Sequence, residues 1–157
     1  MISLTGPLAL GQPHHVGVVV PDIEAAYHEL GEVGGGWVRI AEGRNVDIRM
    51  AHGKASCVLH AAYSRLGPTH LELLQSAEGT VWKPGPAAYI HHLGYWVPAG
   101  ELQRRSRELE AQGVEFEATR WTEDGAVQGW VYHRWPGGFR IELVEWGNPR
   151  QLADFHG

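Results

Sequence analysis

The sequence predicts an α+β fold made of two tandem modules, each ordered strand–helix–strand–strand–strand (βαβββ). Two observations lead to this prediction. The phrase HHVGVVVP at residues 14–21 returns as HHLGYWVP at residues 91–98. Each copy is followed by an amphipathic helical segment and later by a strand-like run that contains Glu-Leu. Because self-similarity at a fixed offset marks a repeated structural unit, we expect one domain with two similar halves.

The first module begins with an apolar strand at 14–20 and continues into a helix. Asp22 is a suitable N-cap residue, and Ile23, Tyr27 and Leu30 recur at helical spacing on one face. Gly31 then provides the residue type that commonly ends a helix. These residues predict a helix between Asp22 and Gly31.

The second module repeats this order after Pro98. In AGELQRRSRELEAQG, Leu102 and Leu109 lie at helical spacing with charged residues on the other face, and Gly113 marks the end. Asp124-Gly125 is a turn signal between two of the later strands. Three further strands are expected per module, at 45–53, 55–63 and 69–75 and at 114–122, 129–135 and 139–146.

These elements divide the chain 1–157 into a first module of about 13–78, a linker at about 79–88, a second module of about 89–146 and a tail at 147–157. The linker, GTVWKPGPAA, is rich in glycine and proline. The length of 157 residues suits one domain with a substantial core.

Composition excludes several classes of protein. Hydrophobic residues make up 43% and charged residues 20%, as in soluble globular chains, and the formal charge of −5 gives no basic surface for nucleic acid or an anionic membrane. The start MISLTGPLALGQP has no basic segment followed by a long apolar one, so we expect no signal peptide and a cytoplasmic protein. The single cysteine, Cys57, excludes an internal disulfide and a thiolate zinc cluster.

Each repeated phrase contains a histidine pair, and alternation along a strand lets only one histidine of each pair face inward. His15 shares a face with Gly17, and His92 shares a face with Gly94. A glycine beside an imidazole leaves room for another group to approach it. Both faces of these strands are apolar, so periodicity alone does not decide which face lines a cleft.

Glu72 and Glu142 occupy matching places in the last strand of each module, in HLELL and RIELV. A carboxylate among buried apolar residues is costly unless it is paired or coordinates a cation. For one such residue a salt bridge would suffice, and Arg140 is a neighbour of Glu142. Two carboxylates and two histidines in matched positions favour a shared metal. This donor set suits zinc, nickel, cobalt, manganese or ferrous iron.

These phrases resemble the vicinal oxygen chelate superfamily, which includes glyoxalases, bleomycin-resistance proteins and extradiol dioxygenases, over residues 13–146. The resemblance implies an open, barrel-like mixed sheet around a cleft, one divalent metal ion and a homodimer. It places the metal ligands at His15, Glu72, His92 and Glu142. It leaves His14 and His91 in packing or supporting roles, with His70 as a substitute ligand for Glu72.

The runs VPDIEAAYHELG and GGFRIELVE are most similar to the methylmalonyl-CoA epimerase-like branch. That branch implies an epimerase or isomerase that abstracts a proton next to a metal-bound carbonyl, through an enolate, in a small oxygenated or acyl substrate. Glu142 and Asp47 are the candidate acid/base residues. Arg104, Arg105 and Arg107 would suit coenzyme A, but an exposed helix face would look the same.

Three alternatives remain open. A glyoxalase-type lyase uses the same His/Glu/His/Glu set, although the first helix lacks the usual Ser-x-x-Phe-Tyr stretch. An extradiol-type dioxygenase would use His15 or a neighbour, His92 and Glu142 on ferrous iron, and Glu72 would then crowd the oxygen site. A non-catalytic, drug-sequestering protein would use its aromatic residues to bind a ligand, with Tyr132 or His133 meeting it. The chain has seven tryptophans, which equally suit a core or a dimer interface: Trp37, Trp82, Trp96, Trp121, Trp130, Trp135 and Trp146.

Overall fold

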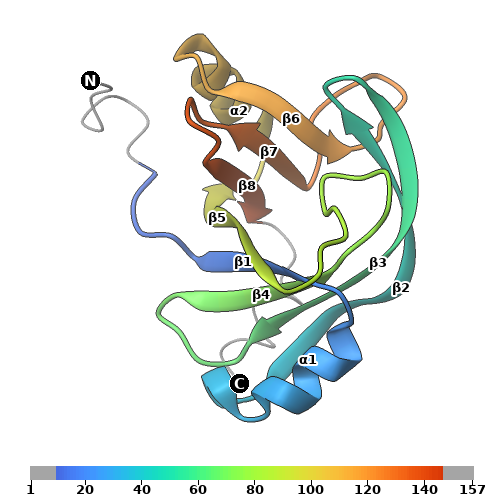
Figure 1. The fold of residues 1–157 in the computed structure, drawn as a ribbon. Coiled ribbons are helices and arrows are strands. Elements are labelled where there is room, and N and C mark those ends of the chain that lie inside the picture. The colour runs from blue at the N-terminus through green and yellow to red at the C-terminus, as the bar shows by residue number, and fades with distance from the viewer. Residues whose placement is uncertain (1–9, 147–157) are drawn as a thin grey trace.

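Eight strands pair into one mixed sheet that closes into a barrel in the order β1-β4-β3-β2-β6-β7-β8-β5. The computed structural model of the chain describes residues 10–146, so the predicted tail at 147–157 lies outside the described residues. The two α-helices of this part lie at opposite ends of the molecule (Figure 1). The strands are β1 His15–Val20, β2 Trp37–Met50, β3 Gly53–Ser64, β4 His70–Gln75, β5 Tyr89–Pro98, β6 Glu115–Arg120, β7 Trp130–Arg134 and β8 Arg140–Trp146.

The predicted βαβββ order is confirmed in both modules. The last strand of each module pairs in parallel with its first strand, β4 with β1 and β8 with β5. The modules then meet at two antiparallel seams, β1 with β5 and β2 with β6. The second seam consists of three residue pairs, from Ile48↔Arg120 to Met50↔Ala118, and it closes the sheet that the sequence led us to expect as open.

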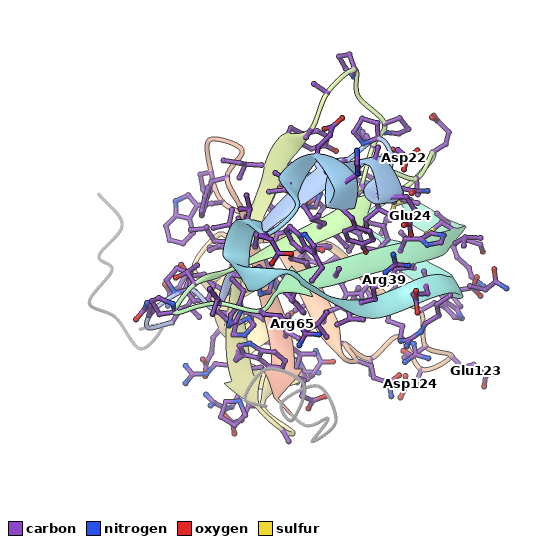
Figure 2. All side chains as sticks on the ribbon, turned by 90° about the horizontal axis from the view of Figure 1, so that it is seen from below. Asp22, Glu24, Arg39, Arg65, Glu123 and Asp124 are labelled. Atoms are coloured by element: carbon purple, nitrogen blue, oxygen red, sulfur yellow. The ribbon has the colours of Figure 1, made fainter. Side chains whose placement is uncertain are left out.

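Helix α1, Ile23–Leu30, forms where predicted. The Asp22 carboxylate accepts a hydrogen bond from the Ala25 N–H at 3.0 Å, which satisfies one of the free donors at the helix start. The Arg39 guanidinium donates to Glu24 at 3.0 Å and so ties α1 to β2 (Figure 2). Both contacts lie on the surface, and the apolar side of α1 faces the sheet with Ile23 and Ala26 buried.

Helix α2, Leu102–Ala111, buries Leu102 and Leu109 against β7 and β8, as its apolar spacing predicted. It ends two residues before Gly113, whose φ of +79° lets the chain turn away. Neither helix of the described part is long and apolar enough to cross a membrane. A short 3₁₀ turn, η1 Val33–Gly35, leads into β2.

Strand β2 begins at Trp37, well before the predicted start at Asn45. Its register against β3 shifts between Arg39 and Ala41 and again between Glu42 and Arg44. These irregularities interrupt the alternation of polar and apolar residues, so the first part of the strand does not show a period of two. The long β2–β3 ribbon supplies one wall of the barrel.

Part of the predicted linker belongs to the core. Thr80, Val81 and Trp82 are buried, and the Trp82 indole N–H donates to the Tyr132 hydroxyl at 3.2 Å. An indole is amphipathic, and burying it with its N–H satisfied stabilises the packing of this segment against the second module. The segment between the modules therefore fills the barrel as well as connecting its halves.

Candidate metal centre

Four buried side chains, His15, Glu72, His92 and Glu142, converge inside the barrel. The Nε2 atom of His15 lies 3.0 Å from Nε2 of His92 and 2.8 Å from Oε2 of Glu142. Nε2 of His92 lies 3.1 Å from Oε2 of Glu72 and 3.2 Å from Oε2 of Glu142. One ligand atom from each residue falls within 4.8 Å of all the others. These are the four residues that the resemblance implied.

Strand register explains why these residues meet. Across β4, β1 and β5, the residues Glu72, Gly17 and His92 lie side by side in one row. Across β1, β5 and β8, His15, Gly94 and Glu142 form the matching row. Each row therefore places a glycine between a glutamate of its own module and the histidine of the other module.

The two glycines are required because each leaves space for the ligand imidazole of the other module. A Cβ atom added at Gly17 would lie 1.9 Å from Cε1 of His92, and one added at Gly94 would lie 2.0 Å from Cε1 of His15. No real side chain tolerates such an approach. From the sequence we expected each glycine to leave room beside the histidine of its own strand, and the structure shows that the room is filled by the histidine of the opposite module.

The four residues fit a divalent metal ion. In a tetrahedral site with metal–ligand bonds of about 2.0–2.2 Å, the ligand atoms lie roughly 3.3–3.6 Å apart, slightly wider than the 2.8–3.2 Å found for most of these contacts. Oε2 of Glu72 is buried, and although Nε2 of His92 lies 3.1 Å away, no donor in the described residues meets this oxygen in hydrogen-bond geometry. A bound cation would satisfy that atom and would offset the cost of burying two carboxylates.

Without an ion, protons must balance the two buried carboxylates. Burial disfavours the charged form of His92, but the nearby Glu142 and Glu72 outweigh it and raise the pKa of His92 to about 9. Burial also works against ionisation of Glu142, yet His92 and His15 lower the pKa of its carboxyl group. The metal-free centre is therefore charged, and binding of an ion must displace a proton.

The first histidine of the β5 pair, His91, orients its neighbour His92. His91 donates from Nε2 to the backbone carbonyl of Val81 at 2.9 Å, so its Nδ1 accepts from Nδ1 of His92, 2.9 Å away. This arrangement leaves Nε2 of His92 directed at the centre. Burial, with the nearby His92 and Arg140, lowers the pKa of His91 to about 3, which keeps that ring neutral and able to accept. Such outer hydrogen bonds commonly set the tautomer of a metal-binding histidine.

The first histidine pair has a different environment. Nδ1 of His14 lies 3.0 Å from Nδ1 of His15, and the His14 ring stacks on His70 with centroids 4.9 Å apart. His70 donates from Nδ1 to the carbonyl of Ser64 at 2.6 Å. The structure therefore places His70 beside the outer histidine and does not bring it to the four converging residues.

Two tyrosines form another matched pair that the sequence did not single out together. Tyr63 pairs with Glu72 across β3 and β4, and Tyr132 pairs with Glu142 across β7 and β8. Burial and the nearby glutamates raise the pKa values of both hydroxyls well above the usual range, so both remain protonated donors. The motifs at these positions, HAAYS and WVYHR, are too dissimilar for the match to be visible without the registers.

The structure does not bring Asp47 to the centre. Its neighbours Val46 and Ile48 face the barrel interior, so Asp47 points outward, where it accepts from Ser56 at 2.5 Å and pairs with Lys54 at 2.9 Å. His133 likewise faces away, with Nε2 2.9 Å from the Ser106 hydroxyl beneath α2, whereas Tyr132 faces the interior. The alternation of a strand accounts for both placements.

A cleft of about 480 Å³ reaches Glu72 and Glu142 from outside. This volume lies within the usual range for small-molecule sites. Of the tryptophans, Trp82 and Trp130 line the cleft, and Trp37, Trp96, Trp121 and Trp135 do not; the side chain of Trp146 is outside the described set. The apolar part of its wall comes from both modules and the linker: Val46, Leu59, Leu74, Trp82, Trp130 and Val144.

The chain belongs to the Glyoxalase/Bleomycin resistance protein/Dioxygenase superfamily, whose family model matches residues 14–132. No functionally curated protein matches the sequence. The match ends before β8, so the inclusion of Glu142 in the candidate site is supported by the geometry described above.

Solved structures with this fold include methylmalonyl-CoA epimerase from Mycobacterium tuberculosis, at 20% identity and a TM-score of 0.54 over 90% of this chain and 91% of that one. A variant of the Streptomyces coelicolor methylmalonyl-CoA epimerase in complex with 2-nitronate-propionyl-CoA matches at 15% identity and 0.55, over 85% and 93%. A variant of 4-hydroxymandelate synthase from Streptomyces coelicolor matches at 12% and 0.51, over 94% of this chain but 54% of that one. At these identities the likeness concerns the fold alone.

Proposed function

We propose that this protein is a divalent-metal-dependent epimerase or isomerase that moves a proton at a carbon next to a carbonyl group. The observation that carries the proposal is the buried His15/Glu72/His92/Glu142 group at the inner end of a cleft of about 480 Å³. When bound there, a divalent ion would polarise the substrate carbonyl and stabilise the negative charge that develops on its oxygen.

The walls of the cleft would hold the reacting part of the substrate away from water. Trp82 and Tyr132 are nearly fully buried, and with Trp130 they form an aromatic surface next to Glu142. A low-dielectric surrounding strengthens the electrostatic interactions on which such a reaction depends.

Glu142 is the proposed acid/base residue. Its carboxyl group lines the cleft, where a substrate would meet it, and a carboxylate is a suitable proton acceptor. It would take the proton from the carbon next to the carbonyl, and return of a proton to the opposite face would give the epimer. Asp47 receives no role here, because its carboxylate lies outside the cleft and is held by Ser56 and Lys54.

The first test is metal content. Purified protein should contain close to one divalent ion per chain by elemental analysis, and His15→Ala or Glu142→Ala should lose it. His28→Ala, an exposed position on α1, is the matched control and should retain the ion. Protein that contains no metal and takes none up on reconstitution would refute the proposal.

The second test is proton exchange in D₂O. Deuterium should enter a small hydroxy-ketone or acyl substrate at the carbon next to the carbonyl, as followed by NMR, and Glu142→Gln should abolish the exchange. Oxygen consumption with a catechol, in the absence of exchange, would instead support the dioxygenase alternative. Homodimerisation and a cytoplasmic location stay predictions, and light scattering would test the first.

A further inference from the structure

Two arginines lie at the outer end of the cleft, on the seam where the modules meet. Arg44 precedes Val46 and Ile48 on the inward face of β2, and Arg120 follows Ala118 on the inward face of β6. Both residues line the same cleft as Glu72 and Glu142. They come from different modules, so the rim, like the metal centre, is built by both halves.

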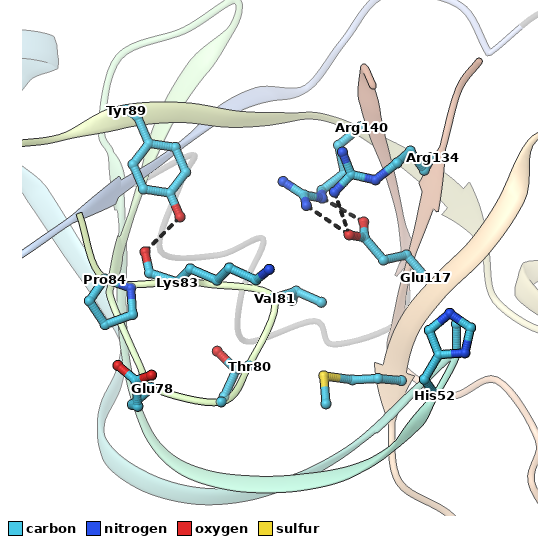
Figure 3. A pocket seen from close by; sticks show the side chains of 13 residues that line it. His52, Glu78, Thr80, Val81, Lys83, Pro84, Tyr89, Glu117, Arg134 and Arg140 are labelled. Carbon is cyan, nitrogen blue, oxygen red and sulfur yellow. Dashed lines mark hydrogen bonds and ion pairs between the residues drawn. The ribbon is translucent and has the colours of Figure 1, made fainter. Parts of the chain in front are cut away.

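Neither of these guanidinium groups makes a hydrogen bond or ion pair with another residue in the described range 10–146, whereas other arginines of the molecule do. Figure 3 shows the contrast in a separate cavity of about 850 Å³, where Arg134 and Arg140 both contact the carboxylate of Glu117 at 2.6 Å. That cavity contains none of the four converging residues. Arg44 and Arg120 thus keep their charge and their donors available at the mouth of the cleft.

The charges of the cleft are separated along its length. Its inner end has Glu72 and Glu142, its middle is apolar and aromatic, and its outer end has the two arginines. Glu145 also lies at the outer end, but its Oε1 accepts the Gly100 N–H at 2.6 Å, which directs that oxygen toward the backbone. A ligand that fills the cleft therefore meets metal-binding groups at one end and free guanidinium groups at the other.

Strand register gives the separation between the two ends. Glu142, Tyr132 and Ala118 are registered across β8, β7 and β6, and Arg120 lies two residues beyond Ala118. Two residues of a strand advance about 7 Å along the strand direction, which is the separation of the two ends along the cleft. A spacer of about five or six carbon atoms spans this interval.

We propose that the substrate carries an anionic group, a carboxylate or a phosphate, at the end opposite its metal-chelating oxygens, with an apolar or aromatic segment between. This inference rests on the proposed metal-dependent function and specifies its substrate class. Arg44 and Arg120 bind the anionic end, because a guanidinium matches the paired oxygens of either group.

The test uses three hydroxamates of one chain length on the cobalt(II)-loaded protein, whose visible absorption reports chelation. Octanohydroxamic acid ends in a methyl group, suberic acid monohydroxamate ends in a carboxylate, and a third probe ends in a phosphonate. At least one anionic probe should bind about tenfold more tightly than the methyl-ended probe, and the stronger one identifies the anion. Higher salt should reduce this preference, since the arginines are exposed.

Variants of the two arginines test whether they cause the preference for an anionic probe. Arg44→Gln and Arg120→Gln should each reduce the preference for the anionic probe, and the double variant should abolish it, with binding of octanohydroxamic acid unchanged. Arg104→Gln, on the exposed face of α2 outside the cleft, is the matched control and should keep the full preference.

Certain results overturn this inference while leaving the metal centre intact. They are equal binding of all three probes, and a preference that survives in the double variant. Cobalt uptake without binding of any probe also counts against it. Failure to take up cobalt at all overturns the proposed function instead, so the two failures are distinguishable.

Discussion

The two modules present the same ligands to the centre but support them differently. In the second module, His91 is buried, donates to the carbonyl of Val81, and its own carbonyl accepts from Arg140 at 3.3 Å. In the first module, the equivalent His14 is half-buried and stacks on His70. The two modules are thus alike in the side chains that reach the centre and differ in the contacts of the histidines behind them.

The difference shows which constraints the duplication imposes. Each module must supply a histidine, a glutamate and a glycine, since each glycine accommodates the other module's imidazole. The hydrogen bonds behind the histidines only need to hold each ring in place, and different side chains can do this. The first module contains the long strands β2 and β3, whereas the equivalent strands β6 and β7 of the second module are shorter. The second module also has an ion cluster in which Arg134 and Arg140 pair with Glu117.

The largest effect is expected at the shared glycines. Gly17→Ala and Gly94→Ala should each abolish metal binding and lower the free energy of unfolding by about 1–3 kcal/mol, because the new methyl group overlaps the opposite imidazole. Elemental analysis measures the loss of metal, and denaturant titration measures the loss of stability. Equal losses in the two variants would show that the two modules contribute equally to the centre.

Gly85→Ala is the control for these variants. Its added Cβ would come no closer than 3.5 Å to another atom, so stability and metal content should hardly change. A Gly17→Ala protein that retains a full complement of metal would show that the two rows are not packed as described.

The supporting histidines should differ in their effect on metal affinity. His91→Ala should weaken binding about 10- to 100-fold, because it removes the group that fixes the His92 tautomer. His14→Ala should weaken it less, since His14 is only half-buried whereas His91 is buried. Competition with a chelator measures the metal affinity of both variants. A larger loss for His14→Ala than for His91→Ala would contradict this difference between the modules.

The ion cluster of the second module should appear in the pH dependence of stability. Although burial opposes it, the hydrogen bonds from Arg140 and Arg134 lower the pKa of Glu117 from 4.5 to about 2. A lowered folded-state pKa stabilises the protein above pH 4.5, and this contribution is lost as the pH falls toward 2.

Glu117→Gln should therefore be less stable at pH 7 by about 1–2 kcal/mol, an amount that allows for solvent screening of a partly exposed group. Thermal unfolding at several pH values should show the deficit shrinking between pH 4.5 and 2. Glu42→Gln, which removes an exposed partner of Arg39 in the first module, should cost less than about 1 kcal/mol. A deficit for Glu117→Gln that does not change with pH would contradict the ionic origin of this stability.

The smallest effect concerns the two helices. Asp22→Ala should lower the free energy of unfolding by about 1 kcal/mol, because Asp22 caps α1 through the Ala25 N–H. Glu101 makes no such cap at the start of α2, so Glu101→Ala should change stability by less than about 0.5 kcal/mol. Chemical denaturation of both variants would detect this difference, and equal losses would argue against a capping role.

Local signals in the sequence were sufficient for the order of the elements, whereas the choice of candidate ligands also needed the family resemblance. Asp22 and Gly31 mark the two ends of α1 as predicted, since capping depends on a few neighbouring residues. The repeated phrases placed His15 and His92 in equivalent strands, and the resemblance selected them together with Glu72 and Glu142. The early start of β2 was missed because its register shifts hide the alternation.

Asp47 and the linker show the limit of that reasoning. Asp47 is in the expected strand but on its outer face, and the Gly- and Pro-rich linker inserts Trp82 into the barrel. Neither outcome can be read from neighbouring residues, because both depend on which face of a strand turns inward when distant strands pair.

By itself the sequence determined the duplicated βαβββ order, the caps of α1 and the residue types available for a metal, since these follow from short-range patterns and from the repeat. Only the tertiary structure decided that Gly17 faces His92 and Gly94 faces His15, that Tyr63 matches Tyr132, and that Arg44 and Arg120 share the rim of one cleft. These relations arise from strand register between the modules, which is set by the packing of the closed barrel as a whole.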